Sequence, residues 1–463
     1  MSIFNSDLKP SEILSVLKDV EGRVHFIGIL GSGMYPLARL LYDRGYKISG
    51  SDDAAREENY RDKSGINITR PTATLGENVV MAVYSLAIDE ENPEILSARM
   101  SGIPLVSRAQ LLGAIMSLFD TRVSVSGSHG KSTVTALVDH ILLSSGISHT
   151  TVCGAKLSSG GSFVDLGGEI FVAEACEYKD SFLRLSPTHQ VITSVELDHT
   201  DYFENIDAIR DSFLRAARNS KYTIINCDDT VASLIADEIK REKPDTSLTY
   251  GMKNAADYRI SAIEMAGENT RFSVKTRDKT FYLTTSLIGE FNLYNITAAV
   301  VVADMLGVAK NDIEKAVESF RSIERRLTLI SEIDGVPIYY DYAHHPSEIR
   351  AIVKALNERY GRVTLIFRPH TYSRTASLWD DFVTELSRAD FTVMLDIYPA
   401  REQAMDGINA ERLAPCIKNA VYSHQNEAVK IALSQKNDVI ALIGAGEVED
   451  VKRELIQLGK NMG

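Results

Sequence analysis

The sequence predicts an α/β protein built from three domains. Its 463 residues exceed what a single hydrophobic core usually supports. Short apolar runs alternate with helical patterns from residue 24 to about 119, and a second series of this kind follows the charged stretch 318–327. Between the two series, residues 124–135 join a β-prone run to a helical pattern through a glycine-rich loop. Such alternation is typical of parallel sheets covered by helices.

The first domain begins with a predicted βαβ unit, and two more strands follow it. The expected elements are strands 24–27, 46–49, 79–84 and 104–106 and a helix at 34–41. Gly28, Gly31 and Gly33 fall in the first turn, and Asp52 follows the second strand, where a dinucleotide-binding unit carries the acid that binds ribose. Leu30 stands where the usual Gly-x-Gly-x-x-Gly pattern has its second glycine. The alternative that these are structural turn glycines is therefore equally open.

The glycine-rich loop of the second domain has the features of a phosphate site. Gly127 and Gly130 allow backbone N–H groups to turn toward an anion at a helix N-terminus, which carries partial positive charge. Lys131 can place its ammonium on the β- and γ-phosphates, and the Ser132 hydroxyl can ligate a magnesium ion. The strict pattern has a glycine at 125, where this chain has a valine, so the loop is a shorter Gly-x-x-Gly-Lys-Ser-Thr variant. We expect a nucleotide site in which Lys131 is exposed and adds little to the core; the alternative is a glycine-rich connection with a solvated lysine.

Polar residues follow the predicted strands of the second domain. The expected elements are strands 122–125, 170–174, 190–195 and 222–225, a hairpin of 271–274 and 281–287, and a helix from 292 to 307. Ligands of open α/β sheets bind beyond the carboxyl ends of the strands, which makes candidates of Glu174, Glu177, Glu196, Asp198 and His199. An acid in this place can hold a metal ion beside nucleotide phosphates. For any single one of them, a solvated loop charge is an equal alternative.

Two polar clusters mark the third domain. Its expected elements are strands 336–341, 363–367, 391–395 and 439–443 and a helix at 346–360. One cluster, at 341–346, reads Asp-Tyr-Ala-His-His-Pro, and the other, at 368–375, reads Arg-Pro-His-Thr-Tyr-Ser-Arg-Thr. Adjacent histidines seldom bind one metal ion together, so we interpret His344 and His345 as polar contacts, with zinc binding as the alternative.

Composition narrows the classes of partner. The formal charge of −13 disfavours nonspecific binding to nucleic acid. No run approaches 18 apolar residues, so no membrane insertion is expected. The N-terminal residues have no apolar stretch typical of a signal peptide, and the four cysteines lie far apart. These features predict a cytoplasmic protein with free thiols.

Taken together, these clusters resemble those of the Mur ligases, which are ATP-dependent amide ligases of peptidoglycan precursor synthesis. The resemblance covers nearly the whole chain and rests on stretches at 25–34, 49–52, 127–133, 174–178, 198–199, 341–346 and 368–375. It implies an N-terminal Rossmann-like domain for a UDP-sugar at 1–119 and a central P-loop ATPase-type α/β domain with a small β element at 120–324. It also implies a C-terminal Rossmann-like domain at 325–463 that completes the amino-acid site.

The resemblance implies a reaction as well. ATP, with Mg²⁺, phosphorylates the lactyl carboxylate of UDP-N-acetylmuramate, and the amino group of L-alanine attacks the acyl phosphate. Two alternatives are open: the family's recycling ligase, which adds a tripeptide to the same sugar, and a nucleotide-binding regulator that kept the fold and lost the chemistry. The short interval from Glu177 to Gln190 favours alanine, and intact Lys131, Ser132, Glu174 and His199 favour an enzyme. A monomer or weak homodimer is expected.

Site residues are implied position by position. Catalytic roles are implied for Lys131, Glu174, His199 and Arg374, and magnesium ligands for Ser132, Glu174 and His199. Nucleotide contacts are implied for Gly127, Ser128, His129, Gly130, Lys131, Ser132, Thr133, Asn295, Arg326 and Asp341. UDP-sugar contacts are implied for Gly28, Gly31, Ser32, Gly33, Met34, Asp52 and Ser85, and contacts at the amino-acid end for Tyr342, His345, His370 and Arg374. Two positions depart from the family pattern: Leu30 replaces a usual glycine, and Thr371 stands where many members have an arginine.

Overall fold

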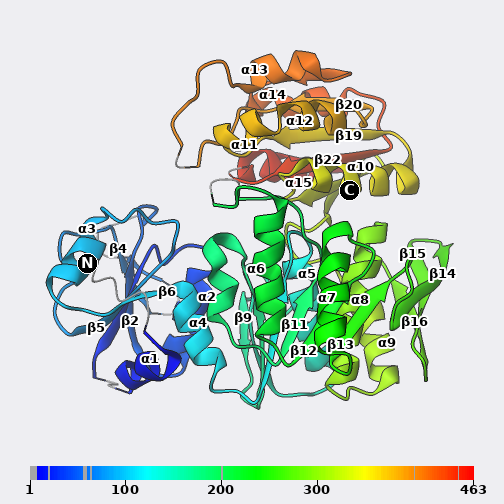
Figure 1. The fold of residues 1–463 in the computed structure, drawn as a ribbon. Helices are drawn as coiled ribbons and strands as arrows, with labels where there is room; N and C mark the ends of the chain where they lie inside the picture. Colours follow the sequence, from blue (N-terminus) through cyan, green and yellow to red (C-terminus); the bar gives the residue numbers. More distant parts are fainter. Residues whose placement is uncertain are drawn as a thin grey trace. The chain divides into compact units, whose positions relative to one another are not determined.

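The computed structural model describes residues 8–18, 21–55, 60–62, 65–199, 202–400, 402–446 and 448–462. The chain forms two compact units, Met1–Thr285 with Tyr294–Phe320, and Ser286–Leu293 with Arg321–Gly463 (Figure 1). The first unit contains two sheets and the second unit contains one. Among the described residues, no helix has the length and apolar character needed to cross a bilayer.

A six-stranded sheet in the order β3-β4-β2-β1-β5-β6 forms the N-terminal part of the first unit. Its strands are β1 (Arg23–Ile27), β2 (Lys47–Ser51), β3 (Tyr60–Arg61), β4 (Asn67–Thr69), β5 (Val79–Tyr84) and β6 (Leu105–Ser107). Its helices are α1 (Pro10–Leu17), α2 (Met34–Asp43), α3 (Pro93–Met100) and α4 (Arg108–Met116). Strand β1 pairs in parallel with β2 on one side and with β5 on the other. The strand order reverses there, so the carboxyl end of β1 is the expected edge for a ligand.

A ten-stranded sheet in the order β16-β15-β14-β13-β12-β11-β7-β10-β8-β9 follows. Its strands are β7 (Thr121–Ser126), β8 (His149–Val152), β9 (Phe163–Asp165), β10 (Ile170–Glu174), β11 (His189–Ile192), β12 (Tyr222–Asn226), β13 (Ser247–Gly251), β14 (Tyr258–Ala266), β15 (Asn269–Lys275) and β16 (Thr280–Thr285). Its helices are α5 (Lys131–Ser144), the 3₁₀ segment η1 (Tyr178–Arg184), α6 (Ile206–Arg218), α7 (Thr230–Glu242), α8 (Glu290–Met305) and α9 (Lys310–Ser319). Strand β7 pairs in parallel with β10 and β11, so the phosphate loop leaves the sheet at its middle.

The second unit has a sheet in the order β17-β18-β22-β19-β20-β21. Its strands are β17 (Thr328–Ile333), β18 (Val336–Asp341), β19 (Val363–Arg368), β20 (Phe391–Met394), β21 (Ala420–Tyr422) and β22 (Val439–Gly444). Its helices are α10 (Pro346–Tyr360), α11 (Tyr372–Ser377), α12 (Trp379–Leu386), α13 (Ala410–Leu413), the 3₁₀ segment η2 (Ala414–Cys416), α14 (Gln425–Leu433) and α15 (Glu449–Met462). Ile288, just before α8, and Phe291, in its first turn, pack against the core of this unit.

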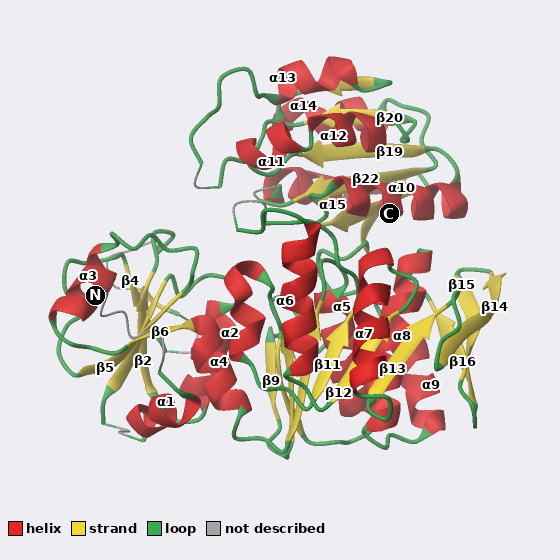
Figure 2. Ribbon diagram, viewed as in Figure 1, coloured by secondary structure: helices red, strands yellow, loops and turns green. Residues whose placement is uncertain are grey.

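The α/β fold class with Rossmann-like outer parts and a central α/β part with a small β element is confirmed. Two details differ from expectation. Strand β11 ends at Ile192, not at 195, because the residues after it turn to hydrogen-bond the phosphate loop. The expected hairpin is a meander of three strands, β14 to β16, seen side by side in Figure 2. The outer half of strand β14 is exposed, and a bulge lies near Ala262 (φ 53°). The strand therefore lacks the regular alternation of buried and exposed side chains by which a sequence reveals a strand.

The two parts of the first unit are joined by direct side-chain contacts. Arg44, which follows α2, donates from Nε and Nη2 to the two carboxylate oxygens of Asp165 on β9, at 2.8 and 2.9 Å. Its guanidinium also lies 5.4 Å from the centre of the Phe119 ring. Gly113 of α4 approaches the carbonyl of Arg184 so closely that a β-carbon would overlap it. These contacts hold the N-terminal sheet against the central one.

Candidate active site

The phosphate loop runs from the end of β7 to the first turn of α5, and its glycines are required by close neighbours. Gly127 has φ 138°, and a β-carbon there would overlap the hydroxyl of Thr193. Gly130 caps α5 with φ 83°, and a β-carbon there would overlap the side-chain oxygen of Asn295. Both conformations favour glycine. Asn295 of α8, distant in the sequence, therefore lies against the start of α5.

The segment after β11 holds the loop in place. The backbone N–H of Ser128 donates to the carbonyl of Ser194 at 2.9 Å, and the N–H of His129 donates to the Ser194 hydroxyl at 3.1 Å. The N–H of Glu196 donates to the Ser128 hydroxyl at 2.8 Å, and His129 Nε2 lies 3.2 Å from a Glu196 carboxylate oxygen. The loop is thus organised by the protein itself, with Thr133 buried behind it in α5.

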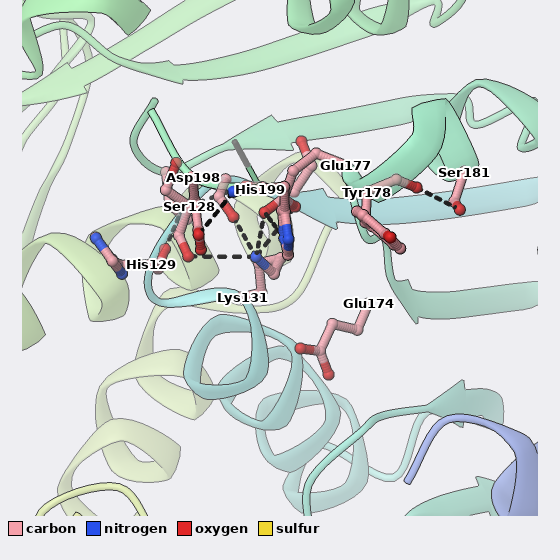
Figure 3. Close-up of polar contacts among 12 residues, drawn as sticks. Ser128, His129, Lys131, Glu174, Glu177, Tyr178, Ser181, Asp198 and His199 are labelled. Carbon is pink, nitrogen blue, oxygen red and sulfur yellow. Dashed lines mark hydrogen bonds and ion pairs between the residues drawn. The ribbon is translucent and has the colours of Figure 1, made fainter. Parts of the chain in front are cut away.

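Lys131 is paired with a buried carboxylate. Its Nζ lies 3.1 Å from each carboxylate oxygen of Glu177 and also donates to the carbonyl of Gly127 at 2.5 Å. The two side chains point toward each other in Figure 3. The Lys131 side chain is 17% exposed and that of Glu177 only 1%, so the expectation of an exposed lysine with little structural role is wrong. The sequence does not show this because the partner follows β10 and not the loop.

The contact between Lys131 and Glu177 shifts the pKa value of each group so that its charged form is favoured. Burial would lower the pKa of Lys131, but the Glu177 carboxylate, together with Cys176 and Glu174, outweighs burial and raises the pKa above its ordinary value. Burial would raise the pKa of Glu177, but Lys131 and the nearby imidazole of His199 together lower it. Both groups are therefore charged at neutral pH.

Ser132 and Glu174 form a second pair, made of oxygen ligands. The Ser132 hydroxyl donates to Glu174 Oε1 at 2.8 Å, and the N–H of Gly154 donates to Glu174 Oε2 at 2.7 Å. Strand β10 ends at Glu174 beside β7, which is why the sheet delivers this carboxylate to the loop. A hydroxyl and a carboxylate at the start of a phosphate loop are the hard donors that Mg²⁺ prefers, so the residues fit that ion.

His199 lies next to Glu177. Its Nε2 is 3.6 Å from Glu177 Oε1, and its ring centre is 4.8 Å from that of Tyr178. Its backbone has φ 54°, and its N–H donates to Asp198 Oδ1 at 2.7 Å. The imidazole lies beside the Lys131–Glu177 pair, as Figure 3 shows.

The residues predicted to bind the UDP-sugar gather at the carboxyl ends of β1, β2 and β5. The turn from Gly28 to Gly33 leads into α2, where Met34 is buried and Ser32 is exposed. Asp52 accepts a hydrogen bond from the N–H of Leu30 at 2.9 Å, so the second strand is tied to this turn. Ser85 follows β5, and Ile88 beyond it packs over Gly28.

Sequence reasoning did not single out two basic residues near this turn. The Arg108 guanidinium lies against Gly33, since a β-carbon there would come within 3.1 Å of it. Lys179 Nζ donates to the carbonyl of Leu86 at 3.3 Å and connects the central part of the unit to the loop after β5. Tertiary packing places Arg108 and Lys179 near this turn, and neither residue belongs to a local sequence motif that would have predicted the position.

The predicted residues of the second unit lie at the carboxyl ends of β18 and β19. Asp341 accepts hydrogen bonds from the N–H groups of Leu327 at 2.6 Å and Ala343 at 2.7 Å, and burial raises its pKa to about 7 although Arg326 opposes the shift. Tyr342 lies beneath the guanidinium of Arg326, 5.9 Å from ring centre to Cζ.

The histidines and Arg374 form the other part of this group. His345 caps α10, and its Nδ1 lies 2.8 Å from the Ser347 hydroxyl. Arg374 Nη1 lies 3.1 Å from Nδ1 of His370, and the ring centres of His370 and His344 are 5.6 Å apart. The guanidinium and the imidazoles offer several donors to a small anionic group.

A glycine loop on a helix N-terminus, a lysine in its first turn and a hydroxyl–carboxylate pair define an enzyme that handles a nucleoside triphosphate. Three family models match the chain: "Mur ligase family, catalytic domain" at 23–120, "Mur ligase middle domain" at 125–303 and "Mur ligase, glutamate ligase domain" at 325–446. The chain belongs to the Mur ligase family of ATP-dependent ligases.

Curated relatives support this assignment along more than nine-tenths of the chain, and solved structures share its fold. The chain is 37% identical to UDP-N-acetylmuramate–L-alanine ligase of Desulfatibacillum aliphaticivorans, over 92% of this chain and 96% of that protein. It is 35% identical to the enzyme of the same name from Aquifex aeolicus, over 96% and 99%. Its fold matches UDP-N-acetylmuramate-alanine ligase MurC of Thermotoga maritima with a TM-score of 0.78 at 23% identity, covering 95% of this chain and 100% of that one. A murein peptide ligase of Psychrobacter arcticus matches with a TM-score of 0.67 at 20% identity, covering 96% and 99%.

Proposed function

We propose that the chain joins L-alanine to the lactyl carboxylate of UDP-N-acetylmuramate with hydrolysis of ATP, in peptidoglycan precursor synthesis. The observation that carries this proposal is the similarity, at 33–37% identity and along more than nine-tenths of the chain, to relatives named UDP-N-acetylmuramate–L-alanine ligase. The organised phosphate loop with its Lys131–Glu177 pair supports an active enzyme over a silent regulator.

The proposed reaction has two steps. A carboxylate oxygen of the sugar takes the γ-phosphoryl group of ATP, which gives an acyl phosphate and ADP. The alanine nitrogen then forms a bond to the acyl carbon, the carbon–oxygen bond to phosphate breaks, and the nitrogen loses a proton. Inorganic phosphate leaves with the former carboxylate oxygen.

Each group of residues has a proposed part in these steps. Lys131, at the N-terminus of α5, stabilises negative charge on the transferring phosphoryl group. Ser132, Glu174 and His199 are the proposed ligands of Mg²⁺, and the chemistry that the ion would supply there is neutralisation of phosphate charge. We propose that the UDP-sugar is bound by the turn at Gly28–Met34 with Asp52 and Ser85. The proposed nucleotide contacts are Gly127–Thr133, Asn295, Arg326 and Asp341. The proposed contacts of the amino acid are Tyr342, His345, His370 and Arg374. We also propose domain limits of 1–119, 120–324 and 325–463.

An assay of ADP release tests the proposal. UDP-N-acetylmuramate and ATP are supplied with alanine, serine, glycine or the tripeptide L-alanyl-γ-D-glutamyl-meso-diaminopimelate. Release that depends on alanine and on the sugar supports the proposal. Release with the tripeptide alone indicates the recycling reaction, and ATP binding without any release indicates a regulator. Sedimentation checks the prediction of a monomer or weak homodimer.

A further inference from the structure

Thr371, at the N-cap of α11, has a strained backbone. Its φ of 61° and ψ of 148° belong to a region that is populated almost only by glycine, and its side chain is β-branched. Strain of this kind persists only where the surrounding structure fixes the residue, and it gathers at functional sites. The contacts that hold Thr371 in this conformation therefore show which residues fix the turn 371–373 before Arg374.

One set of contacts comes from Tyr398, which follows β20. The N–H of Thr371 donates to the carbonyl of Tyr398, and the N–H of Tyr398 donates to the carbonyl of Pro369, both at 2.8 Å. The ring of His370 stacks on that of Tyr398, with centres 5.8 Å apart and planes 24° apart. The backbone of 369–371 is thus anchored to the connection that leaves β20.

The second set comes from Glu402, farther along the same connection. Its carboxylate accepts hydrogen bonds from the N–H of Ser373 at 2.9 Å and from the Ser373 hydroxyl. These hydrogen bonds outweigh burial and lower the pKa of Glu402, so the carboxylate is ionised at neutral pH.

Arg374 is the next residue in the chain, and its place depends on this turn. Its N–H donates to the Thr371 hydroxyl at 3.4 Å, and its Nη1 lies 3.1 Å from Nδ1 of His370. A guanidinium has only donors, so Nδ1 of His370 accepts this hydrogen bond. A shift of residues 371–373 would therefore move the fork of Arg374 and its contact with His370 together.

We propose that Glu402 is a positioning residue, which fixes the turn 371–373 and thereby aims Arg374 at the carboxylate of the amino-acid substrate. The inference rests on the proposed function, because that function gives Arg374 its ligand. Glu402 itself bonds the turn and lies 29 positions from Ser373, beyond the reach of any sequence motif.

Steady-state kinetics of three variants test the proposal. Glu402→Ala is expected to raise the KM for alanine about tenfold, with the KM values for ATP and UDP-N-acetylmuramate unchanged, since a lost hydrogen-bonded carboxylate loosens one turn only. Glu402→Gln keeps one acceptor oxygen and is expected to recover part of the loss. Asp406→Ala removes an exposed carboxylate from the same connection and is expected to leave all three KM values unchanged. Equal changes in all three KM values, or none in Glu402→Ala, would overturn the proposal.

Amide hydrogen exchange at 371–375 provides a readout without substrate. Faster exchange there in Glu402→Ala, with the β19 amides unchanged, is expected if Glu402 fixes the turn. Unchanged exchange would overturn the positioning role even if the enzyme is active. If the unmodified protein releases no ADP with alanine, the proposed function fails instead, and exchange still decides whether Glu402 fixes the turn.

Discussion

Lys131 Nζ lies 3.1 Å from both carboxylate oxygens of Glu177, a side chain that is 1% exposed. A buried carboxylate requires a partner of opposite charge, because transfer of an ion away from water is unfavourable. The lysine of the phosphate loop therefore serves both stability and phosphoryl transfer. Its loss has two consequences that measurements can separate.

Lys131→Met is expected to abolish turnover and also to lower the free energy of unfolding by about 3 kcal/mol, because it leaves Glu177 charged and buried without its cation. ADP release gives the first quantity, and urea unfolding gives the second. The double variant Lys131→Met with Glu177→Gln should regain much of the stability and none of the activity. A single variant as stable as the unmodified protein would show that the pair is not needed for folding.

Glu174→Gln is expected to raise the Mg²⁺ concentration needed for half-maximal activity about tenfold, because an amide is a weaker ligand than a carboxylate for this ion. The variant is expected to fold, because glutamine keeps one oxygen that can accept the hydrogen bond from Gly154, and the Ser132 hydroxyl can accept one from the amide. Titration of Mg²⁺ at saturating substrates measures the effect. Glu169→Gln, at an exposed position just before β10, is the matched control. A curve that coincides with the control would remove Glu174 from the metal site.

His199→Ala is expected to affect the Mg²⁺ titration more than the KM for UDP-N-acetylmuramate. The imidazole lies on the phosphate side of the site, 3.6 Å from Glu177, and not at the turn Gly28–Gly33. The variant also removes the imidazole near Glu177, which helps lower the pKa of that carboxylate. If only the sugar KM changes, His199 belongs to the sugar site.

The phosphate loop, the strands around it and Glu174 could be predicted because their signals are local. Glycine spacing, a β-prone run before it and a helical pattern after it lie within twenty residues, and Glu174 ends an apolar run. Glu177 was only one of five candidate carboxyl and imidazole groups. Its role depends on a turn in which Lys179 and Asp180 have positive φ values of 51° and 56°, and no sequence pattern encodes that turn.

Contacts between distant segments were beyond sequence reasoning for a related reason. Arg108 meets Gly33 across 75 positions, and Glu402 meets Ser373 across 29, so periodicity carries no information about either. Strand β17, at the edge of its sheet and half exposed, lacked the continuous apolar run of the buried strands. Such residues are fixed by tertiary packing alone.

Asp341 gives a prediction about pH. Burial raises its pKa from 3.8 to about 7 in the folded protein, so the folded state favours the protonated carboxyl. Its contribution to stability is complete below pH 3.8 and is lost as the pH rises toward 7. At about 1.4 kcal/mol per pKa unit, the loss is roughly 4 kcal/mol.

Asp341→Asn is the comparison for this effect, because an amide does not titrate. The free energy of unfolding of the unmodified protein minus that of the variant should fall as the pH rises from 4 to 7.5. Urea unfolding at several pH values gives this difference. A difference that rises over the same range would mean that the carboxyl is ionised in the folded state, with Arg326 as the dominant partner.

Arg374 provides the sharpest test of the amino-acid site. The planar guanidinium can bond both oxygens of a carboxylate, whereas Thr371, three residues earlier, carries no charge to share the task. Arg374→Ala is expected to raise the KM for alanine about 30-fold while the KM for ATP changes little. Arg374→Lys should recover only part of the loss, because an ammonium keeps the charge but not the fork, and cannot reproduce the contact with His370. Arg453→Ala, at an exposed position on α15, is the control. Kinetics with each substrate varied separately decide the matter: a rise in the KM for ATP without one for alanine would assign Arg374 to the nucleotide and refute the proposed amino-acid site.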